Sequence, residues 1–308
     1  MMAIPTALEV TTEIFSQPEM WRRAIQHGVA AAALPVHGVP ALILGCGTSY
    51  YIGEAYASLR NAQDRGRTRA AVPAEIAYVD DDETIIVLSR SGTTSELIDT
   101  AKRLRSTHRV VGVIGTPETP LVDACHDVID LSYANERAVM QTRFATTAFT
   151  LLRSTISELG ETLIDQAEEA LLRPPPTPTP QHVVFLGTGF SLGLAHEAAL
   201  KCIEASGRRA EAYAANEYLH GPIAAAGSDT VVWPLAPISA GLAVAITDTC
   251  ATLVTPSLDP QAELVCVHRM AVAMAMEEGR DPDRPPFLSR SVQFDAALPS
   301  ARRHESIT

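Results

Sequence analysis

Short apolar runs alternate along this chain with segments whose apolar positions recur at helical spacing. The runs that predict buried strands are residues 42–44, 84–88, 109–114, 127–131, 184–186, 230–234 and 264–267. Helical spacing follows the second run at residues 95–105 and the fifth run from Ser191 onward. Strands that alternate with helices indicate parallel sheets with crossover helices, and such sheets place ligands beyond the carboxyl ends of their strands. The predicted fold class is therefore α/β.

A proline-rich segment separates two halves of similar pattern. Residues 173–180 contain five prolines, which neither continue a helix nor join a central strand. The segment predicts a spacer between a first subdomain at residues 1–172 and a second at 181–308, which includes a C-terminal tail. Gly45 and Gly47 recur 142 residues later as Gly187 and Gly189, each pair between an apolar run and a predicted helix. The halves are therefore predicted to share one architecture.

Composition narrows the class of protein. The 308 residues carry a net charge of −12, with 46% hydrophobic and 19% charged residues, as in soluble globular proteins. This acidic balance argues against a nucleic-acid partner, whereas local backbone donors can still hold a small anion. Five scattered cysteines without a C-x-x-C pair predict reduced thiols in a cytoplasmic protein. No apolar run is long enough to predict a membrane span.

A hydroxyl-rich turn, Ser-Arg-Ser-Gly-Thr-Thr at residues 89–94, precedes a predicted helix. Exposed N–H groups and the helix dipole favour an anion there, although capping of the helix alone would also explain these residue types. The turn lacks the lysine of a Walker loop, so a nucleoside triphosphate is not expected. The two G-x-G turns lack the third glycine of the dinucleotide fingerprint, because Tyr50 and Leu192 stand at that position.

The long predicted helix of the second half carries three ionisable residues on one face. Glu197, Lys201 and Glu204 are spaced i, i+4 and i+7 among apolar neighbours. The pattern fits either a solvated helix face or a group of residues that transfers protons. His220, in a His-Gly-Pro sequence, is a further candidate, whereas His196 has no partner motif and is interpreted as structural.

These elements together resemble the sugar isomerase (SIS) domain family, whose best-known member is the isomerase half of glucosamine-6-phosphate synthase. The similar motifs are a leading helix at residues 13–19, C-G-T-S at 46–49, the phosphate loop at 89–94, E-x-A-L-K-x-x-E at 197–204, E-x-x-H-G-P at 217–222 and D-x-D-x-P at 281–285. The resemblance covers nearly the whole chain. It implies two flavodoxin-like subdomains, each a parallel sheet flanked by helices, in a homodimer with a shared active site.

The resemblance also implies a role for each site residue. Glu204 would be the base that moves a proton between C1 and C2 of a sugar phosphate. Glu197 and Lys201 would support that transfer, and His220 of the neighbouring subunit would assist ring opening. The residues that would bind the substrate are Cys46, Gly47, Thr48, Ser49, Ser89, Arg90, Ser91, Thr94, Val139, Gln141 and Arg290. This chemistry needs a placed carboxylate and donors for the developing oxyanion, but no metal and no cofactor.

Four positions depart from the synthase pattern. Arg90 and Thr93 replace the glutamine and glutamate of its phosphate loop, and both changes add positive character. Gln141 stands where the synthase has serine. Arg290 stands where the synthase has its C-terminal lysine, and a guanidinium stays protonated and forms no Schiff base. Synthase chemistry is therefore not expected of this chain.

The function implied is that of a phosphosugar isomerase or deaminase that acts on an amino-sugar phosphate and releases ammonia. The sequence has no cysteine nucleophile directly after Met1, so we expect no glutaminase reaction to supply ammonia. Two alternatives are a fructosamine-6-phosphate deglycase and a non-catalytic sugar-phosphate sensor. The sensor is less favoured, because residues 1–40 are too short and too acidic for a basic helix-turn-helix.

Overall fold

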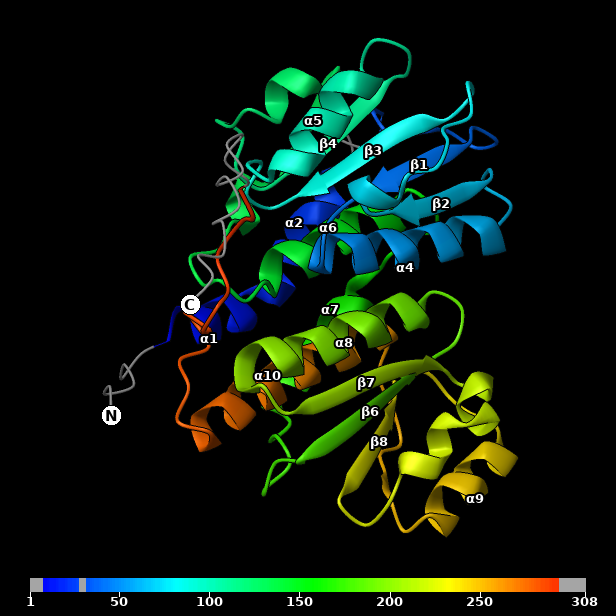
Figure 1. Cartoon of the computed structure of the whole chain (residues 1–308), viewed down its shortest axis with the longest axis vertical. Helices are drawn as coiled ribbons and strands as arrows, with labels where there is room; N and C mark the ends of the chain where they lie inside the picture. The colour runs from blue at the N-terminus through cyan, green and yellow to red at the C-terminus, as the bar shows by residue number, and fades with distance from the viewer. Residues whose placement is uncertain (1–7, 28–31, 294–308) are drawn as a thin grey trace, which may run out of the picture.

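Two parallel β-sheets lie on either side of a layer of helices, as Figure 1 shows. The computed structural model describes residues 8–27 and 32–293. The first residues of the predicted first subdomain and the end of the predicted C-terminal tail lie outside this range. Within the described residues, no helix has the length and apolar character needed to cross a membrane.

The first sheet has the strand order β2-β1-β3-β4-β5, all parallel. Its strands are β1 (Ala41–Leu44), β2 (Thr68–Ala71), β3 (Thr84–Ser89), β4 (Val110–Ile114) and β5 (Asp127–Asp130). The helices that follow β1 and β3 are α4 (Thr48–Ala62) and α5 (Ser95–Leu104). The β1 and β4 strands are buried along their whole length, as their continuous apolar runs predicted. This is the flavodoxin-like order, in which ligands bind at the carboxyl ends of the strands, between the first and third strands, where the strand order reverses.

The second sheet repeats the same order as β7-β6-β8-β9. Its strands are β6 (His182–Gly187), β7 (Arg209–Ala214), β8 (Thr230–Pro234) and β9 (Thr252–Leu253). Its helices are α8 (Ser191–Ser206), α9 (Ala240–Asp248) and α10 (Pro260–Glu277). β6 and α8 stand where β1 and α4 stand in the first half, so the predicted repeat of the two G-x-G turns is confirmed. The predicted α/β class with two parallel sheets is confirmed as well.

The layer between the sheets joins the halves into one continuous core. Besides α4, α8 and α10, it contains α1 (Glu9–Phe15), α2 (Gln17–Gln26), α6 (Arg143–Ser154) and α7 (Glu161–Leu172). Gly193 lets α8 approach α4, because a Cβ there would lie 2.6 Å from both Ala55 N and Tyr51 O. Short 3-10 helices are η1 (Pro73–Glu75), η2 (Val122–Ala124), η3 (Ser132–Ala134), η4 (Asn216–His220) and η5 (Pro222–Ala225).

One predicted strand is wrong. Residues 264–267 lie inside α10, which begins after Asp259, whose carboxylate accepts a hydrogen bond from Gln261 N. The helix is buried on nearly all sides between α1, α7 and α8, so its apolar residues form a run and not a stripe. Such a run has no helical period to distinguish it from a buried strand. The proline-rich segment lies between α7 and β6, and the subdomain boundary proposed there stays a prediction.

Candidate active site

A cavity of about 380 Å³ opens at the carboxyl edge of the first sheet. Its size suits a small polar metabolite. It is bordered by five segments of the chain: the β1–α4 turn, the phosphate loop with α5, the loop before α6, the end of α8 and the C-terminal segment. The lining residues are Cys46, Gly47, Thr48, Arg90, Thr94, Glu96, Val139, Gln141, Glu204, Leu288, Ser289, Arg290, Ser291 and Val292.

Most of the predicted site residues therefore meet at this cavity, and the others fall into three groups. Ser49, Ser89 and Ser91 belong to the two turns that border it but do not line it. Glu197 and Lys201 lie behind Glu204 and are fully buried. His220 is exposed at the end of η4, in the second half of the chain, and does not line the cavity.

The phosphate loop folds back on itself through its own hydroxyls. Ser89 Oγ accepts a hydrogen bond from Gly92 N at 3.0 Å, and Ser91 Oγ accepts one from Thr93 N at 3.3 Å. Each hydroxyl keeps its own hydrogen for a further acceptor. Gly92 has a φ of +65°, and a Cβ there would lie 2.0 Å from Thr119 Oγ1, so this tight turn requires glycine. The loop thus leads directly into the start of α5, where free N–H groups favour an anion.

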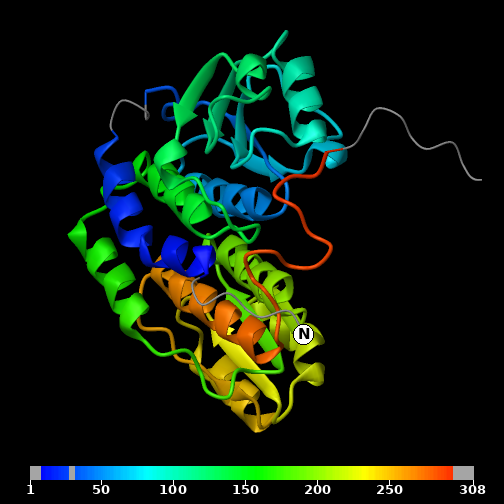
Figure 2. The ribbon, with the colours of Figure 1, turned by 90° about the vertical axis from the view of Figure 1, so that its left-hand side faces the viewer.

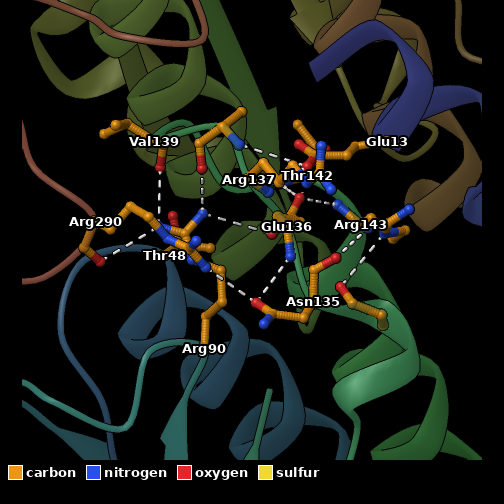
Figure 3. Close-up of polar contacts among 12 residues, drawn as sticks. Glu13, Thr48, Arg90, Asn135, Glu136, Arg137, Val139, Thr142, Arg143 and Arg290 are labelled. Carbon is orange, nitrogen blue, oxygen red and sulfur yellow. Dashed lines mark hydrogen bonds and ion pairs between the residues drawn. The ribbon is translucent and has the colours of Figure 1, made fainter. Parts of the chain in front are cut away.

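Arg90 is almost completely buried, with 2% of its surface exposed. Its Nη1 donates to Ala138 O at 2.8 Å, and its Nη2 donates to Val139 O at 3.1 Å, as Figure 3 shows. The Glu136 carboxylate lies 3.7 Å from the Arg90 guanidinium. Burial lowers the pKa of Arg90, and the charge of Glu136 opposes that change. The added positive charge predicted for this loop therefore has a buried counter-charge.

The three ionisable residues of α8 form a chain of contacts and not a solvated face. Lys201 Nζ donates to Glu204 Oε2 at 2.5 Å and to Thr48 Oγ1 at 2.8 Å, and it lies 3.6 Å from the Glu197 carboxylate. Burial raises the pKa of Glu197 to about 8, and the Lys201 charge opposes this. Burial alone would lower the pKa of Lys201, but the charges of Glu197 and Glu204 have a larger opposite effect, and together they raise this pKa above its usual value. The lysine therefore stays an ammonium that fixes Glu204 at the cavity wall.

A second group of acidic residues supports the wall formed by residues 136–141. Glu13 Oε1, on α1, accepts hydrogen bonds from Arg137 N at 2.5 Å and from Ala138 N at 3.4 Å. Burial raises the pKa of Glu13 to about 7, and the nearby Glu136 charge adds to this. Asp283, in the D-x-D-x-P motif, accepts hydrogen bonds from the first N–H groups of α1. Its own carbonyl accepts one from Val139 N at 2.9 Å.

The site contains residues that sequence reasoning missed. Glu96, in the first turn of α5, lines the cavity, and its place directly after the phosphate loop could have indicated this. The neighbours of Arg290 in the C-terminal segment line it too. Glu13 and Glu136 belong to no short motif, so only the three-dimensional contacts reveal them. Among the described residues, no group of three or more His, Cys, Asp or Glu side chains is placed to hold a metal ion.

Comparison with known proteins agrees with this geometry. Residues 40–157, less than half of the chain, match the SIS domain family model. The glutamine–fructose-6-phosphate aminotransferase (isomerizing) of Xylella fastidiosa is 27% identical over 274 residues, which cover 73% of this chain and 44% of that protein. The chain thus spans less than half the length of this curated relative.

Solved structures show the same fold along nearly the whole chain. The glucosamine-6-phosphate deaminase of Thermotoga maritima is 23% identical, with a TM-score of 0.77 over 92% of this chain and 99% of that one. The tagatose-6-phosphate ketose/aldose isomerase of Escherichia coli is 18% identical, with a TM-score of 0.73 over 92% of this chain and 96% of that one. The likeness at these identities shows the shared arrangement of two parallel sheets.

Proposed function

We propose that this chain is a phosphosugar isomerase of the SIS type that acts on an amino-sugar phosphate and releases ammonia. The observation that carries the proposal is the position of Glu204. Its carboxylate lines the same cavity as the phosphate loop and is held by the buried Lys201 ammonium at 2.5 Å. A base that lines the same cavity as an anion site can act on carbons near one end of a sugar whose phosphate binds at the other end.

The reaction follows from these groups. The phosphate binds Ser89, Ser91, Thr94 and the start of α5. Glu204 removes the proton from the carbon next to the carbonyl or imine and returns it to the neighbouring carbon. Thr48 lines the cavity, accepts a hydrogen bond from the Lys201 ammonium behind it, and keeps its own hydroxyl hydrogen for the developing oxyanion. Water then adds to the resulting imine, and ammonia leaves to give a ketose phosphate.

Substitution of Glu204 tests the base assignment. We expect Glu204→Gln to lower turnover by about a hundredfold to ten-thousandfold, because proton abstraction loses its acceptor. Binding should remain, since the phosphate loop is untouched. NMR of a panel of hexosamine and hexulose phosphates follows the products, and calorimetry follows binding. Glu168→Gln, at an exposed carboxylate of α7, is the control. Full turnover in Glu204→Gln would disprove the assignment.

The predicted homodimer can be tested through His220, which lies away from the cavity of its own subunit. If His220 acts in the neighbouring subunit, mixing inactive Glu204→Gln and His220→Ala chains should restore activity. Random pairing makes half of the dimers mixed, each with one intact site, so about a quarter of wild-type turnover should return. No recovery after verified subunit exchange would place His220 outside the shared site. The cytoplasmic location and the lack of a nucleic-acid partner stay predictions.

One observation favours a second candidate, the fructosamine-6-phosphate deglycase. Arg290 lines the cavity, and its side chain donates to Asn135 Oδ1 at 3.1 Å. Within the part of the chain that the structure describes, no carboxylate forms an ion pair with it. An amino acid joined to the sugar would bring a carboxylate that this guanidinium can bind in bidentate fashion. Release of a free amino acid from a fructosamine 6-phosphate, without ammonia from hexosamine phosphates, would favour this candidate.

A further inference from the structure

The C-terminal segment, residues 284–293, runs from the second half of the chain up to the phosphate loop of the first half, as Figure 2 shows. Its apolar side chains face solvent to a large extent. Phe287 is fully exposed, and Leu288 and Val292 are 45% and 54% exposed. Burial of apolar surface therefore contributes little to holding this segment against the cavity.

Polar contacts hold the segment instead, and three of them come from the phosphate loop and the residue after it. Thr93 Oγ1 donates to Ser291 Oγ at 2.9 Å. Ser95 N donates to Val292 O at 3.3 Å. Arg90 Nη2 donates to Arg290 O at 3.3 Å. Among these three donors, only Arg90 is charged, and it is also buried.

The same guanidinium holds a second wall of the cavity. Arg90 donates to Ala138 O and Val139 O, so one side chain joins the phosphate loop, the loop before α6 and the C-terminal segment (Figure 3). A guanidinium offers five N–H donors in a fixed plane, which suits several carbonyl acceptors at once. A glutamine at this position has one NH₂ group and could not reach all three.

The counter-charge of this guanidinium is itself fixed. Glu136 Oε1 accepts hydrogen bonds from Thr142 N at 2.6 Å and Arg143 N at 2.7 Å, at the start of α6. Its other oxygen lies toward Arg90, at 3.7 Å from Nη1. Because Glu136 is fixed by a helix N-terminus, Arg90 has a fixed electrostatic partner and its neighbouring carbonyls keep their place.

We propose that Arg90 is a positioning residue that fastens the C-terminal segment and the 136–141 loop to the phosphate loop and so closes the cavity. The phosphate itself is bound by the hydroxyls and N–H groups of the loop. Arg90 then contributes to substrate binding through the walls it holds. The proposal does not depend on which sugar phosphate the cavity takes.

Two measurements without substrate test the proposal: tryptic cleavage after Arg290 and alkylation of the cavity thiol Cys46, followed by mass spectrometry. Arg90→Gln should speed both about tenfold, because a charged hydrogen bond that closes the segment is lost. Arg90→Lys keeps the charge but cannot donate to all three carbonyls, so its cleavage and alkylation rates should lie between those of wild type and Arg90→Gln. Arg137→Gln, an exposed arginine on the same loop, should leave both rates unchanged.

Binding of inorganic phosphate separates this role from a direct one. If Arg90 acts by closing the cavity, Arg90→Gln should weaken phosphate binding less than threefold while both rates rise. Unchanged cleavage and alkylation rates together with a large loss of phosphate affinity would overturn the proposal and make Arg90 a phosphate ligand. If Arg90→Gln does not fold, Arg90→Lys decides by the same measurements, and wild-type rates in that variant would also overturn the proposal. Activity on sugar phosphates enters neither measurement, so a failure of the proposed function leaves this test intact.

Discussion

Replacing Glu13 by glutamine should make the protein more stable at neutral pH. Glu13 is 3% exposed, and one of its oxygens has no hydrogen-bond partner among the described residues. Burial raises the pKa of this carboxyl from 4.5 to about 7. Glutamine keeps the shape and can still accept from Arg137 N and Ala138 N, but it carries no charge. The variant therefore removes the cost of ionising a carboxyl inside the protein.

The size and direction of the effect follow from the two pKa values. Below pH 4.5 the carboxyl is protonated in both the folded and the unfolded chain, and its contribution to the free energy of unfolding is fully present. Between pH 4.5 and about 7 the unfolded chain releases its proton first, so rising pH lowers the stability of the wild type. The difference between these values corresponds to about 3 kcal/mol in the free energy of unfolding. The stability gained by Glu13→Gln should grow from near zero at pH 4.5 to about that amount at pH 8.

Urea unfolding followed by the fluorescence of the buried Trp21 measures this difference at pH 4.5, 6 and 8. Glu9→Gln, which removes a carboxylate from the same helix at a position 49% exposed, is the control. A Glu13→Gln variant that is less stable than wild type at pH 8 would refute the reasoning. So would a free energy of unfolding that differs from that of wild type by the same amount at all three pH values. Either result would mean that Glu13 is ionised in the folded chain and that its charge helps to hold residues 137 and 138.

Two further predictions concern α8. Lys201→Met leaves Glu197 and Glu204 without their cation, so it should destabilise the protein by about 3 kcal/mol at pH 8. The loss should be smaller at pH 5, because burial raises the pKa of Glu197 to about 8 and this carboxyl is then protonated; urea unfolding at both values checks this. Gly193→Ala places a Cβ 2.6 Å from backbone atoms of Tyr51 and Ala55, so it should cost about 1–3 kcal/mol by forcing α4 and α8 apart. An unchanged melting temperature in Gly193→Ala would contradict the close approach of the helices.

The residues that share a local motif were predictable from the sequence, and those that act through distant contacts were not. The first G-x-G turn and the hydroxyl-rich loop each span no more than six residues, and the structure brings both to one cavity. Arg90 was predicted to line the site, but its buried partner Glu136 lies 46 positions later in the chain. The helical run at residues 264–267 was mistaken for a strand because burial on all sides erases the period that distinguishes the two.

The role of Glu13 was hidden for the same reason. Its partners are backbone N–H groups of residues 137 and 138, and no side-chain pattern at either place announces them. The spacing of Glu197, Lys201 and Glu204 indicated a common face, but whether that face is solvated depends on how the halves pack. The structure settles this point, since α10 and α4 cover α8.

The two halves share one architecture but differ in the residues that could carry chemistry. The positions 142 residues before the ionisable residues of α8 hold Ala55, Leu59 and Ala62, which carry no proton-transfer chemistry. In the second half, β8 is followed by residues 235–239, Leu-Ala-Pro-Ile-Ser, which lack the glycine and paired hydroxyls of the phosphate loop. The first half thus carries the turn that we propose binds the phosphate, and the second half carries the helix that we propose transfers the proton. Under the proposed function neither half holds a complete site, because the cavity is lined by residues of both halves. Separating the halves should therefore end the activity even if each half still folded.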